Sequence, residues 1–317
     1  MGAKIVLVTG TSLVPRSVCD YIESHGYAVR RVEQDTFTSA ELHRALKDAS
    51  GYLIGGYEEP LAEHFEQSGQ LEAVAWIGTD YKANVPGWRS AVELGISMIN
   101  APGANATSVA EFTTLLLLTM ARPFTGSIAT ADTPRPGLPA PGIDLRGRRL
   151  GIIGCGRIGA SVARIAAFGF GMEVSYHSPR RNLIAEHSLG IAYRPRNDLL
   201  SSCDMITLHR PGPGEGEQPE IGRPECELLL DEAVLINTAH HRLLDPDALL
   251  RVMDTKCVRA AIDGAPDGEA WNRLMAYGPE RFLVTPPMAF NTTDANLRAS
   301  LQTAKAVCDV LTRSGRG

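Results

Sequence analysis

Three glycines stand in the pattern Gly154-x-Gly156-x-x-Gly159, directly after an apolar run and directly before a stretch of helical character. Glycines at this spacing permit a tight turn, close approach of the backbone to a phosphate and close packing of helix on strand. The helix N-terminus adds unpaired amides and the positive end of the helix dipole. The segment therefore predicts a pyrophosphate-binding loop, with Arg157 and Ile158 inside it; the alternative is a glycine-rich turn without a ligand.

The end of the next strand indicates which dinucleotide this loop binds. About twenty residues beyond the last glycine, an acidic residue normally accepts hydrogen bonds from the ribose 2′-hydroxyl. Here the strand ends in Ser178, without a carboxylate, and Arg180 and Arg181 follow. Guanidinium groups suit a 2′-phosphate, so the sequence predicts NADPH rather than NADH. The alternative is a solvated basic turn.

Composition and charge point to a small-molecule partner. The chain has 317 residues, of which 44% are hydrophobic and 21% charged, with a net charge of −5. This charge argues against nucleic-acid binding, and no apolar run is long enough to cross a membrane. The six cysteines show neither pairing nor metal-ligand spacing, so we expect reduced thiols, a cytoplasmic protein and no metal site.

Short β-branched runs alternate with amphipathic stretches along the whole chain, the pattern of parallel sheets with crossover helices. The length suits two such domains. Strands are expected at Ile5–Val8, Ala28–Val32, Tyr52–Ile54, Ala73–Ile77, Ser97–Ile99, Gly151–Ile153, Glu173–Tyr176, Met205–Leu208, Val234–Asn237, Ala260–Ile262 and Phe282–Val284. Helices are expected at Ser39–Asp48, Trp88–Leu94, Thr107–Arg122, Ala160–Phe168 and Thr293–Leu311.

Two segments rich in proline and glycine interrupt this alternation. Residues 133–142 cannot hold a helix and predict a surface loop between the two α/β series. Residues 211–223 predict an acidic loop to which the sequence assigns no purpose.

In their order along the chain, these motifs resemble those of the D-isomer-specific 2-hydroxyacid dehydrogenases, a family that includes NADPH-dependent glyoxylate and hydroxypyruvate reductases. The segments that carry the resemblance are Ile77–Tyr81, Asn100–Asn105, Val109–Glu111, Leu145–Gly147, Gly154–Gly159, Cys203–His209, Ile236–Ala239 and Thr285–Pro287.

The resemblance implies an α/β fold with two Rossmann-like domains and an active-site cleft between them. Residues 1–101 and 287–317 would form a flavodoxin-like substrate domain, and residues 102–286 the dinucleotide-binding domain. It implies further cofactor contacts at His209, Pro211, Thr238, Ala239 and Asp263, and substrate contacts at Gly78, Thr79 and Tyr81. A structural role for each is the alternative: Asn237 and Thr238 would only end a strand, and His209 would satisfy a backbone carbonyl.

The family's catalytic groups are missing at the matching positions. Its arginine, glutamate and histidine correspond to His240, Pro266 and Pro287. Proline has no ionisable group, so Pro287 cannot protonate an alkoxide, and no histidine follows His241. His240 titrates near neutrality and is the candidate catalytic and substrate-binding residue. The alternative is that His240 and His241 cap the strand and pack under the cofactor.

Three functional hypotheses follow. The first, which we favour, is an NADPH-dependent oxidoreductase acting by hydride transfer on an imine, an activated double bond or an unusual carbonyl, in specialised metabolism. The second is a D-2-hydroxyacid dehydrogenase or 2-keto acid reductase with substitute catalytic groups. The third is a catalytically silent protein that senses NADP(H) or regulates a partner.

A homodimer is the last expectation. In the family that the chain resembles, cofactor domains pair through the long helix expected at 107–122. Its apolar side chains are Phe112, Leu115, Leu116, Leu117 and Met120. They form a wider surface than one core face needs. Burial of this helix inside one chain is the alternative.

Overall fold

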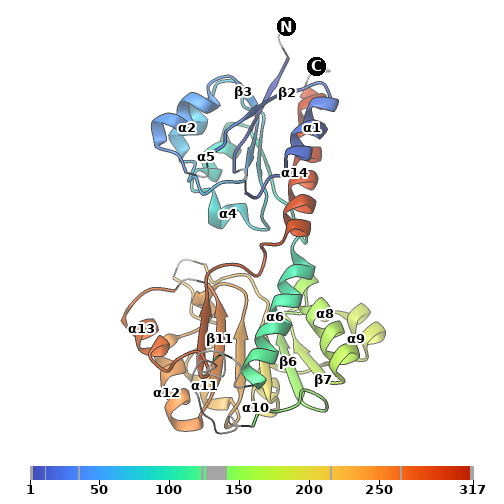
Figure 1. Cartoon of the computed structure of the whole chain (residues 1–317), viewed down its shortest axis with the longest axis vertical. Coiled ribbons are helices and arrows are strands. Elements are labelled where there is room, and N and C mark those ends of the chain that lie inside the picture. Colours follow the sequence, from blue (N-terminus) through green and yellow to red (C-terminus); the bar gives the residue numbers. More distant parts are fainter. Residues whose placement is uncertain are drawn as a thin grey trace, which may run out of the picture. The chain divides into compact units, whose positions relative to one another are not determined.

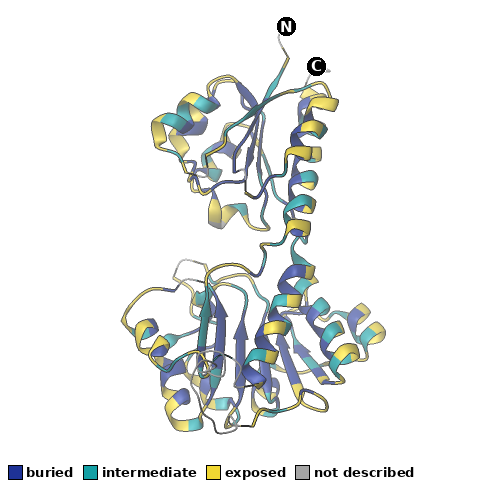
Figure 2. Ribbon diagram, in the orientation of Figure 1, coloured by how far each residue is buried: buried dark blue, intermediate teal, exposed yellow. Residues whose placement is uncertain are grey.

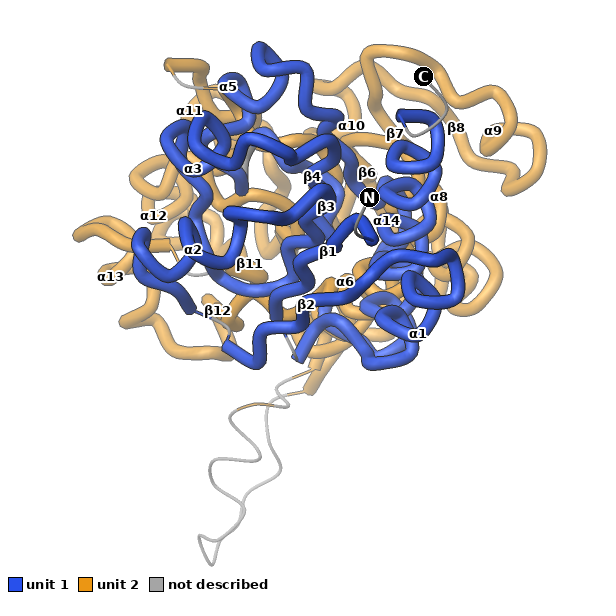
Figure 3. Tube along the Cα trace, turned by 90° about the horizontal axis from the view of Figure 1, so that it is seen from above, with its two compact units in different colours: residues 1–105, 291–317 blue, residues 106–290 orange. Residues whose placement is uncertain are grey.

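The computed structural model describes residues 3–10, 12–34, 36–122, 125, 141–214, 216–264 and 266–314. It divides into two compact units, coloured separately in Figure 3. Unit 1 joins Met1–Asn105 to Asn291–Gly317, and unit 2 is Ala106–Phe290. The sequence analysis placed these borders four residues earlier, and the substrate and cofactor roles of the units stay predictions. The proline-rich loop expected at 133–142 lies outside the described residues, apart from 141 and 142.

Unit 1 is built on a parallel sheet of five strands in the order β2-β1-β3-β4-β5 (Figure 1). This is the flavodoxin-like order. The strands are β1 (Ile5–Val8), β2 (Ala28–Arg31), β3 (Ala49–Ile54), β4 (Ala73–Trp76) and β5 (Ser97–Ile99). The helices are α1 (Arg16–Ser24), α2 (Ser39–Leu46), α3 (Ala62–Glu66), α4 (Tyr81–Asn84), α5 (Trp88–Glu93) and α14 (Thr293–Ser314).

Alternate residues of these strands face opposite layers, because side chains in a strand alternate with a period of two. Val6 and Val8 belong to the apolar cluster that includes residues of α1 and α14. Leu7 belongs to a second cluster, with residues of α2, α3 and α5. Helix α2 begins at Ser39 because Thr38 and Glu41 form a reciprocal capping box.

Unit 2 is built on a parallel sheet of seven strands in the order β12-β11-β10-β9-β6-β7-β8. The strands are β6 (Arg149–Ile153), β7 (Glu173–His177), β8 (Ala192–Tyr193), β9 (Met205–Leu208), β10 (Val234–Asn237), β11 (Arg259–Asp263) and β12 (Phe282–Thr285). The helical elements are α6 (Ala106–Ala121), α8 (Arg157–Arg164), the π-helical turn η1 (Ile165–Gly169), α9 (Leu183–Leu189), α10 (Arg196–Ser202), α11 (Arg223–Leu228), η2 (His241–Leu243), α12 (Pro246–Lys256) and α13 (Glu269–Met275).

Helices cover both faces of this sheet, so its strands are buried on both sides (Figure 2). One face packs against α6 and α8, and the other packs against α10, α11, α12 and α13. The strand order reverses between β6 and β9, the point where doubly wound sheets bind ligands at the carboxyl ends of their strands.

The predicted fold class, an α/β protein with two Rossmann-like parallel sheets, is confirmed. Several expected bounds differ from the structure by one to three residues, for example Tyr52–Ile54 against β3 (Ala49–Ile54), and three further differences follow. The helix expected at Ala160–Phe168 begins at Arg157 and continues as the π-helical turn from Ile165. Strand β8 was missed, because two residues carry no readable alternation. The closing helix extends to Ser314.

Candidate dinucleotide site in unit 2

The three glycines of the loop between β6 and α8 each have a different reason to lack a side chain. Gly154 has a φ of +100°, and a Cβ there would lie 2.5 Å from the His209 carbonyl oxygen. A Cβ at Gly159 would lie 2.0 Å from the Gly154 carbonyl oxygen, so α8 packs directly on the loop. At Gly156 a Cβ would meet no protein atom within 4 Å. The open space at Gly156 fits the close approach of a phosphate group.

The start of α8 leaves room for an anion. Gly156 is its N-cap and makes no side-chain capping hydrogen bond, and the first turn contains no acidic residue. The amides and the dipole of α8 therefore face the loop without a side-chain competitor. This arrangement fits the pyrophosphate of a dinucleotide.

Two side chains beyond β7 hold the glycine loop in place. The Ser178 hydroxyl accepts a hydrogen bond from the Cys155 backbone N–H at 2.7 Å. The Asn182 side-chain amide donates to the Cys155 carbonyl oxygen at 2.9 Å, and its oxygen caps α9 by accepting from the Ala185 N–H. Ser178 thus braces the loop, and its predicted role in place of the usual carboxylate stays a prediction. Asn182 was missed by the sequence analysis, although an asparagine before a helical run is a capping signal.

The two predicted guanidiniums differ in their surroundings. Arg180 is exposed, and no hydrogen bond or ion pair of its side chain is found among the described residues. Arg181 forms a two-pronged ion pair with Glu186, with Nη2–Oε2 and Nε–Oε1 distances of 2.5 and 3.0 Å. Glu186, on α9, is therefore a carboxylate near this strand end that the sequence analysis did not identify.

His209, which follows β9, lies beside the glycine loop at the point where the strand order reverses. Its N–H donates to the Ile153 carbonyl at 2.8 Å. Its Nε2 is buried and makes no hydrogen bond within the described residues, and burial lowers the pKa of the ring to about 3. A neutral imidazole with an unpartnered nitrogen is available to a polar ligand group. Pro211, two residues on, is exposed.

The turn after β10 is shaped by Asn237. Its side chain accepts from the Ala239 N–H at 2.9 Å and donates to the His240 carbonyl oxygen at 3.0 Å. The Thr238 hydroxyl lies 2.8 Å from that of Thr113 on α6. Asn237 and Thr113 were not among the predicted site residues, although Asn237 ends the strand as the sequence analysis considered.

His240 is exposed and caps η2, because its Nδ1 accepts from the Arg242 N–H at 3.1 Å. Its ring lies 4.5 Å from that of His241, which in turn meets the edge of Trp271 at 6.1 Å. Partial burial lowers the pKa of both histidines, and for His240 the neighbouring His241 and Arg242 add to the effect. His240 thus caps the turn η2 rather than the strand, and the packing of the pair under a cofactor stays a prediction.

The Asp263 carboxylate is largely engaged by its own unit. It accepts from the Thr285 hydroxyl at 2.8 Å and from the backbone N–H groups of Met288 and Ala289 at 3.0 Å each. These bonds hold the segment that contains Pro287 against the end of β11. The contact to a nicotinamide carboxamide expected from the resemblance stays a prediction.

The predicted substrate residues lie in unit 1, at the end of β4. The Gly78 carbonyl accepts from the Ala101 N–H at 2.9 Å, and the Thr79 carbonyl accepts from the Asn100 side chain. Tyr81 opens α4 and meets the edge of Trp88 at 6.0 Å. Lys82 and Arg89 each lie 5.2 Å from the Trp88 ring. The structure thus adds two cations beside the predicted tyrosine.

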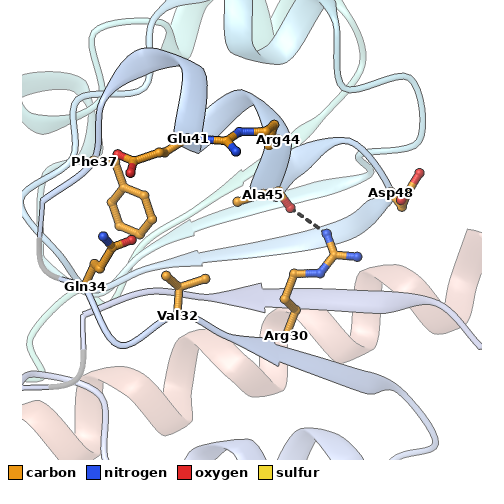
Figure 4. Close-up of a pocket in the computed structure, with 8 residues that line it drawn as sticks. All are labelled: Arg30, Val32, Gln34, Phe37, Glu41, Arg44, Ala45 and Asp48. Atoms are coloured by element: carbon orange, nitrogen blue, oxygen red, sulfur yellow. Dashed lines mark hydrogen bonds between the residues drawn. The ribbon is translucent and has the colours of Figure 1, made fainter.

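A separate hollow in unit 1 lies between β2 and α2 (Figure 4). Arg30 reaches across it and donates to the Ala45 carbonyl oxygen at 2.8 Å. Arg44, Glu41 and Asp48 also line it, so it has charges of both signs. None of the predicted site residues lies there. Within the described residues, no cluster of three or more His, Cys, Asp or Glu side chains is placed to hold a metal ion, and no helix has the length and apolar character to cross a bilayer.

Comparisons with known proteins agree on one family. The model of the NAD binding domain of D-isomer specific 2-hydroxyacid dehydrogenases matches residues 116–289. The chain is 33% identical over 229 residues to a glyoxylate reductase of Aeropyrum pernix, covering 68% of this chain and 66% of that protein. It is 30% identical over 275 residues to a hydroxypyruvate reductase of Thermotoga maritima, covering 84% and 86%. The match spans between 52% and 66% of the length of several curated relatives.

A solved structure gives the same answer for the fold. An acyclic imino acid reductase, solved in complex with NADPH and D-Arg, has a TM-score of 0.82 and 23% sequence identity. The likeness covers 98% of this chain and 97% of that one, and at this identity it concerns the fold alone. Because the family model covers more than half of the chain, the chain belongs to the D-isomer specific 2-hydroxyacid dehydrogenases, a family of NAD-binding oxidoreductases.

Proposed function

We propose that this chain is an NADPH-dependent oxidoreductase that acts by hydride transfer on a substrate other than a simple 2-keto acid. An imine, an activated double bond or an unusual carbonyl compound fits best. The proposal is carried by His240, Pro266 and Pro287, the residues that the resemblance places at the positions of the family's arginine, glutamate and histidine. Neither proline can donate a proton or hold a carboxylate.

The glycine loop, the uncapped start of α8 and the buried Nε2 of His209 support cofactor binding. Ser178 and the exposed Arg180 support a 2′-phosphate at the end of β7. When bound, the nicotinamide supplies the hydride. The remaining task of the chain is to hold the substrate and to provide a proton.

His240 is the proposed proton donor. Its Nδ1 accepts the Arg242 N–H, so the neutral ring carries its proton on Nε2. Because partial burial lowers the pKa of His240 below its ordinary value, the ring is mostly neutral at pH 7 and protonated only in acid. If His240 is the acid, the rate with a good substrate rises as the pH falls through this lowered pKa. A flat profile in wild-type protein would contradict the assignment.

The second candidate function is reduction of a 2-keto acid by substitute catalytic groups. It is favoured by the names of the relatives, which are glyoxylate and hydroxypyruvate reductases. Lys82 and Arg89 beside Trp88 are the cations that would hold a substrate carboxylate in place of the missing arginine. A catalytically silent NADP(H)-binding protein is the remaining alternative.

A substrate screen separates the three functions. NADPH oxidation is followed with glyoxylate, pyruvate and hydroxypyruvate, with the same keto acids mixed with ammonia or amines to form imines, and with activated alkenes. We expect negligible turnover of the keto acids, because the family's acid–base pair contributes about 10²- to 10⁴-fold in rate. Efficient turnover of a keto acid alone would establish the second function, and tight NADPH binding without turnover of any compound would favour the third.

His240→Ala and His241→Ala are matched variants for the substrate found in this way. The rings are neighbours in the same turn, so a general disturbance of the turn affects both. We expect a large loss of kcat for His240→Ala and a small one for His241→Ala. Full activity of His240→Ala would remove His240 from the mechanism while leaving the cofactor proposal intact.

We also propose a cytoplasmic homodimer. On α6, Leu116, Leu117 and Met120 are buried within unit 2, whereas Leu115 and Leu118 expose 51% and 38% of their surface. The exposed leucines are the part of α6 left for a second copy of the chain. All six cysteines are free thiols, which suits a reducing compartment.

A further inference from the structure

Helix α9 carries a carboxylate into the region where a 2′-phosphate is expected. Besides its two-pronged pair with Arg181, Glu186 accepts a hydrogen bond from the Tyr176 hydroxyl at 2.6 Å. The same hydroxyl accepts from the Asn182 N–H at 2.6 Å, and Asn182 in turn holds the Cys155 carbonyl of the glycine loop. A continuous chain of hydrogen bonds therefore links Glu186 to the phosphate loop.

The two side chains of the Arg181–Glu186 ion pair differ in their exposure to solvent. The Glu186 side chain is 17% exposed and the Arg181 side chain 57%. Arg181 also lies over the Tyr193 ring, with 5.5 Å between its guanidinium carbon and the ring centroid. Glu186 is thus held from beneath by Tyr176 and covered from outside by Arg181.

The net charge of this region is smaller than the sequence indicates. Arg180 and Arg181 bring two positive charges, and Glu186 cancels one of them. Of these two arginines, only Arg180 has no carboxylate partner among the described residues. A 2′-phosphate at this strand end would meet a net charge of +1 rather than +2.

We propose that Glu186 is a specificity-determining residue, a carboxylate that Arg181 masks, and that the Arg181–Glu186 ion pair sets how strongly the site prefers NADPH over NADH. This inference rests on the proposed cofactor function and deepens it. In dinucleotide sites that select NADH, a carboxylate accepts hydrogen bonds from the ribose 2′-hydroxyl and repels a 2′-phosphate. Glu186 would act in this way once Arg181 no longer covers it.

The proposal orders four proteins by charge at the strand end. The net charge of residues 180, 181 and 186 is +2 in Glu186→Gln and +1 in the wild type. It is +1 in the double variant Arg181→Ala/Glu186→Gln and 0 in Arg181→Ala. The measured quantity is the selectivity ratio, which is the Kd of NADH divided by the Kd of NADPH. Losing or gaining one charge-assisted contact changes this ratio about tenfold.

We therefore expect Glu186→Gln to raise the ratio about tenfold and Arg181→Ala to lower it about tenfold. The double variant should return to within a few-fold of wild type, because it removes the guanidinium and the carboxylate together. Both dissociation constants are obtained by fluorescence titration at one fixed ionic strength, since salt screens these exposed charges. Competition by adenosine 2′,5′-bisphosphate against adenosine 5′-monophosphate repeats the measurement on the adenosine half alone.

The exposed pair of Arg223 and Glu227 on α11 provides matched controls. Its Nε–Oε1 distance is 3.1 Å, and Arg223→Ala and Glu227→Gln should leave the selectivity ratio unchanged. Melting temperatures of all variants test whether they fold.

Three results would overturn the inference. An unchanged ratio in Glu186→Gln removes Glu186 from cofactor selection. A double variant that selects as poorly as Arg181→Ala shows that Arg181 binds the phosphate directly and Glu186 is a bystander. Equal weakening of NADH and NADPH shows that the pair only holds α9 in place. If wild type binds neither dinucleotide nor the bisphosphate, the proposed cofactor function fails and this inference fails with it.

Discussion

Gly156 and Gly159 lie three residues apart at the start of α8, but a methyl group added at each should have a different effect on stability and on cofactor binding. A Cβ at Gly159 would sit 2.0 Å from the Gly154 carbonyl oxygen, so α8 must move away from the loop to admit it. Overpacking of this kind costs about 1–3 kcal/mol. In a unit of this size each kcal/mol lowers Tm by about 2–4 °C. Gly159→Ala should therefore lose several degrees of Tm together with cofactor affinity.

Gly156→Ala should leave Tm almost unchanged and weaken cofactor binding. Its φ of −82° suits any residue, and no protein atom lies within 4 Å of the added methyl group. Replacing glycine by alanine at an N-cap costs less than about 1 kcal/mol, so Tm should hardly change. The methyl group instead occupies the space left for the phosphates. Losing one hydrogen bond to a charged group costs about 1.5–3 kcal/mol, which weakens binding roughly tenfold to 150-fold.

The assay pairs a melting curve with a titration of NADPH for each variant. The reasoning requires Gly159→Ala to be the less stable protein and Gly156→Ala to be a stable protein that binds poorly. If Gly156→Ala binds NADPH as tightly as wild type, the loop does not carry the pyrophosphate. If Gly156→Ala melts as early as Gly159→Ala, the space at Gly156 is not open as described.

Three further predictions concern the Ser178 hydrogen bond, the pKa of His209 and the exposed leucines of α6. Ser178→Ala leaves the buried Cys155 N–H without its acceptor, so chemical denaturation should show a loss of about 1–3 kcal/mol, and a change below 0.5 kcal/mol would refute the bracing role. Burial lowers the pKa of His209 to about 3, so below the unfolded pKa of about 6.5 the unfolded chain gains a proton that the folded chain refuses. Stability should then fall by up to about 1.4 kcal/mol per pH unit between pH 6 and 3, and less steeply in His209→Asn; equal slopes would contradict the pKa. Leu115→Glu with Leu118→Glu should convert a dimer into monomer in sedimentation at micromolar concentration, whereas a wild-type protein that is already monomeric would refute the proposed homodimer.

Most of the fold could be predicted, because parallel strands that are buried on both faces appear in the sequence as short continuous hydrophobic runs. Ile5–Val8, Met205–Leu208 and Val234–Asn237 lie at the expected residues, since each is an unbroken apolar or β-branched run between polar turns. Strand β8 escaped because a two-residue edge strand has no such run. The π-helical turn after α8 escaped because a helical pattern does not distinguish i+4 from i+5 hydrogen bonds.

Only those parts of the candidate site that depend on a fixed spacing in the sequence could be predicted. The roles of the glycines were predicted from their fixed spacing, and the space around Gly156 and the close contact at Gly159 fit those roles. The partner of Arg181 is a side chain five residues later on another element, and only the packing of α9 on the strand end brings Glu186 back. The lowered pKa of His209 could not be predicted from the sequence either, because the burial of its ring depends on the layers that cover both faces of the sheet.

The composition of unit 1 from two distant segments has a consequence for synthesis on the ribosome. Val6 and Val8 of β1 share an apolar cluster with Val307 and Leu311 of α14. At about 5–20 residues per second, translation of the 193 residues between β5 and α14 (residues 100–292) takes roughly 10–40 s. During that interval one face of the first sheet is covered by α1 without α14, whereas unit 2 is a continuous segment and can fold as it emerges. Synthesis of unit 1 therefore begins before that of unit 2 and ends after it, and its partly covered sheet is exposed to aggregation in the meantime.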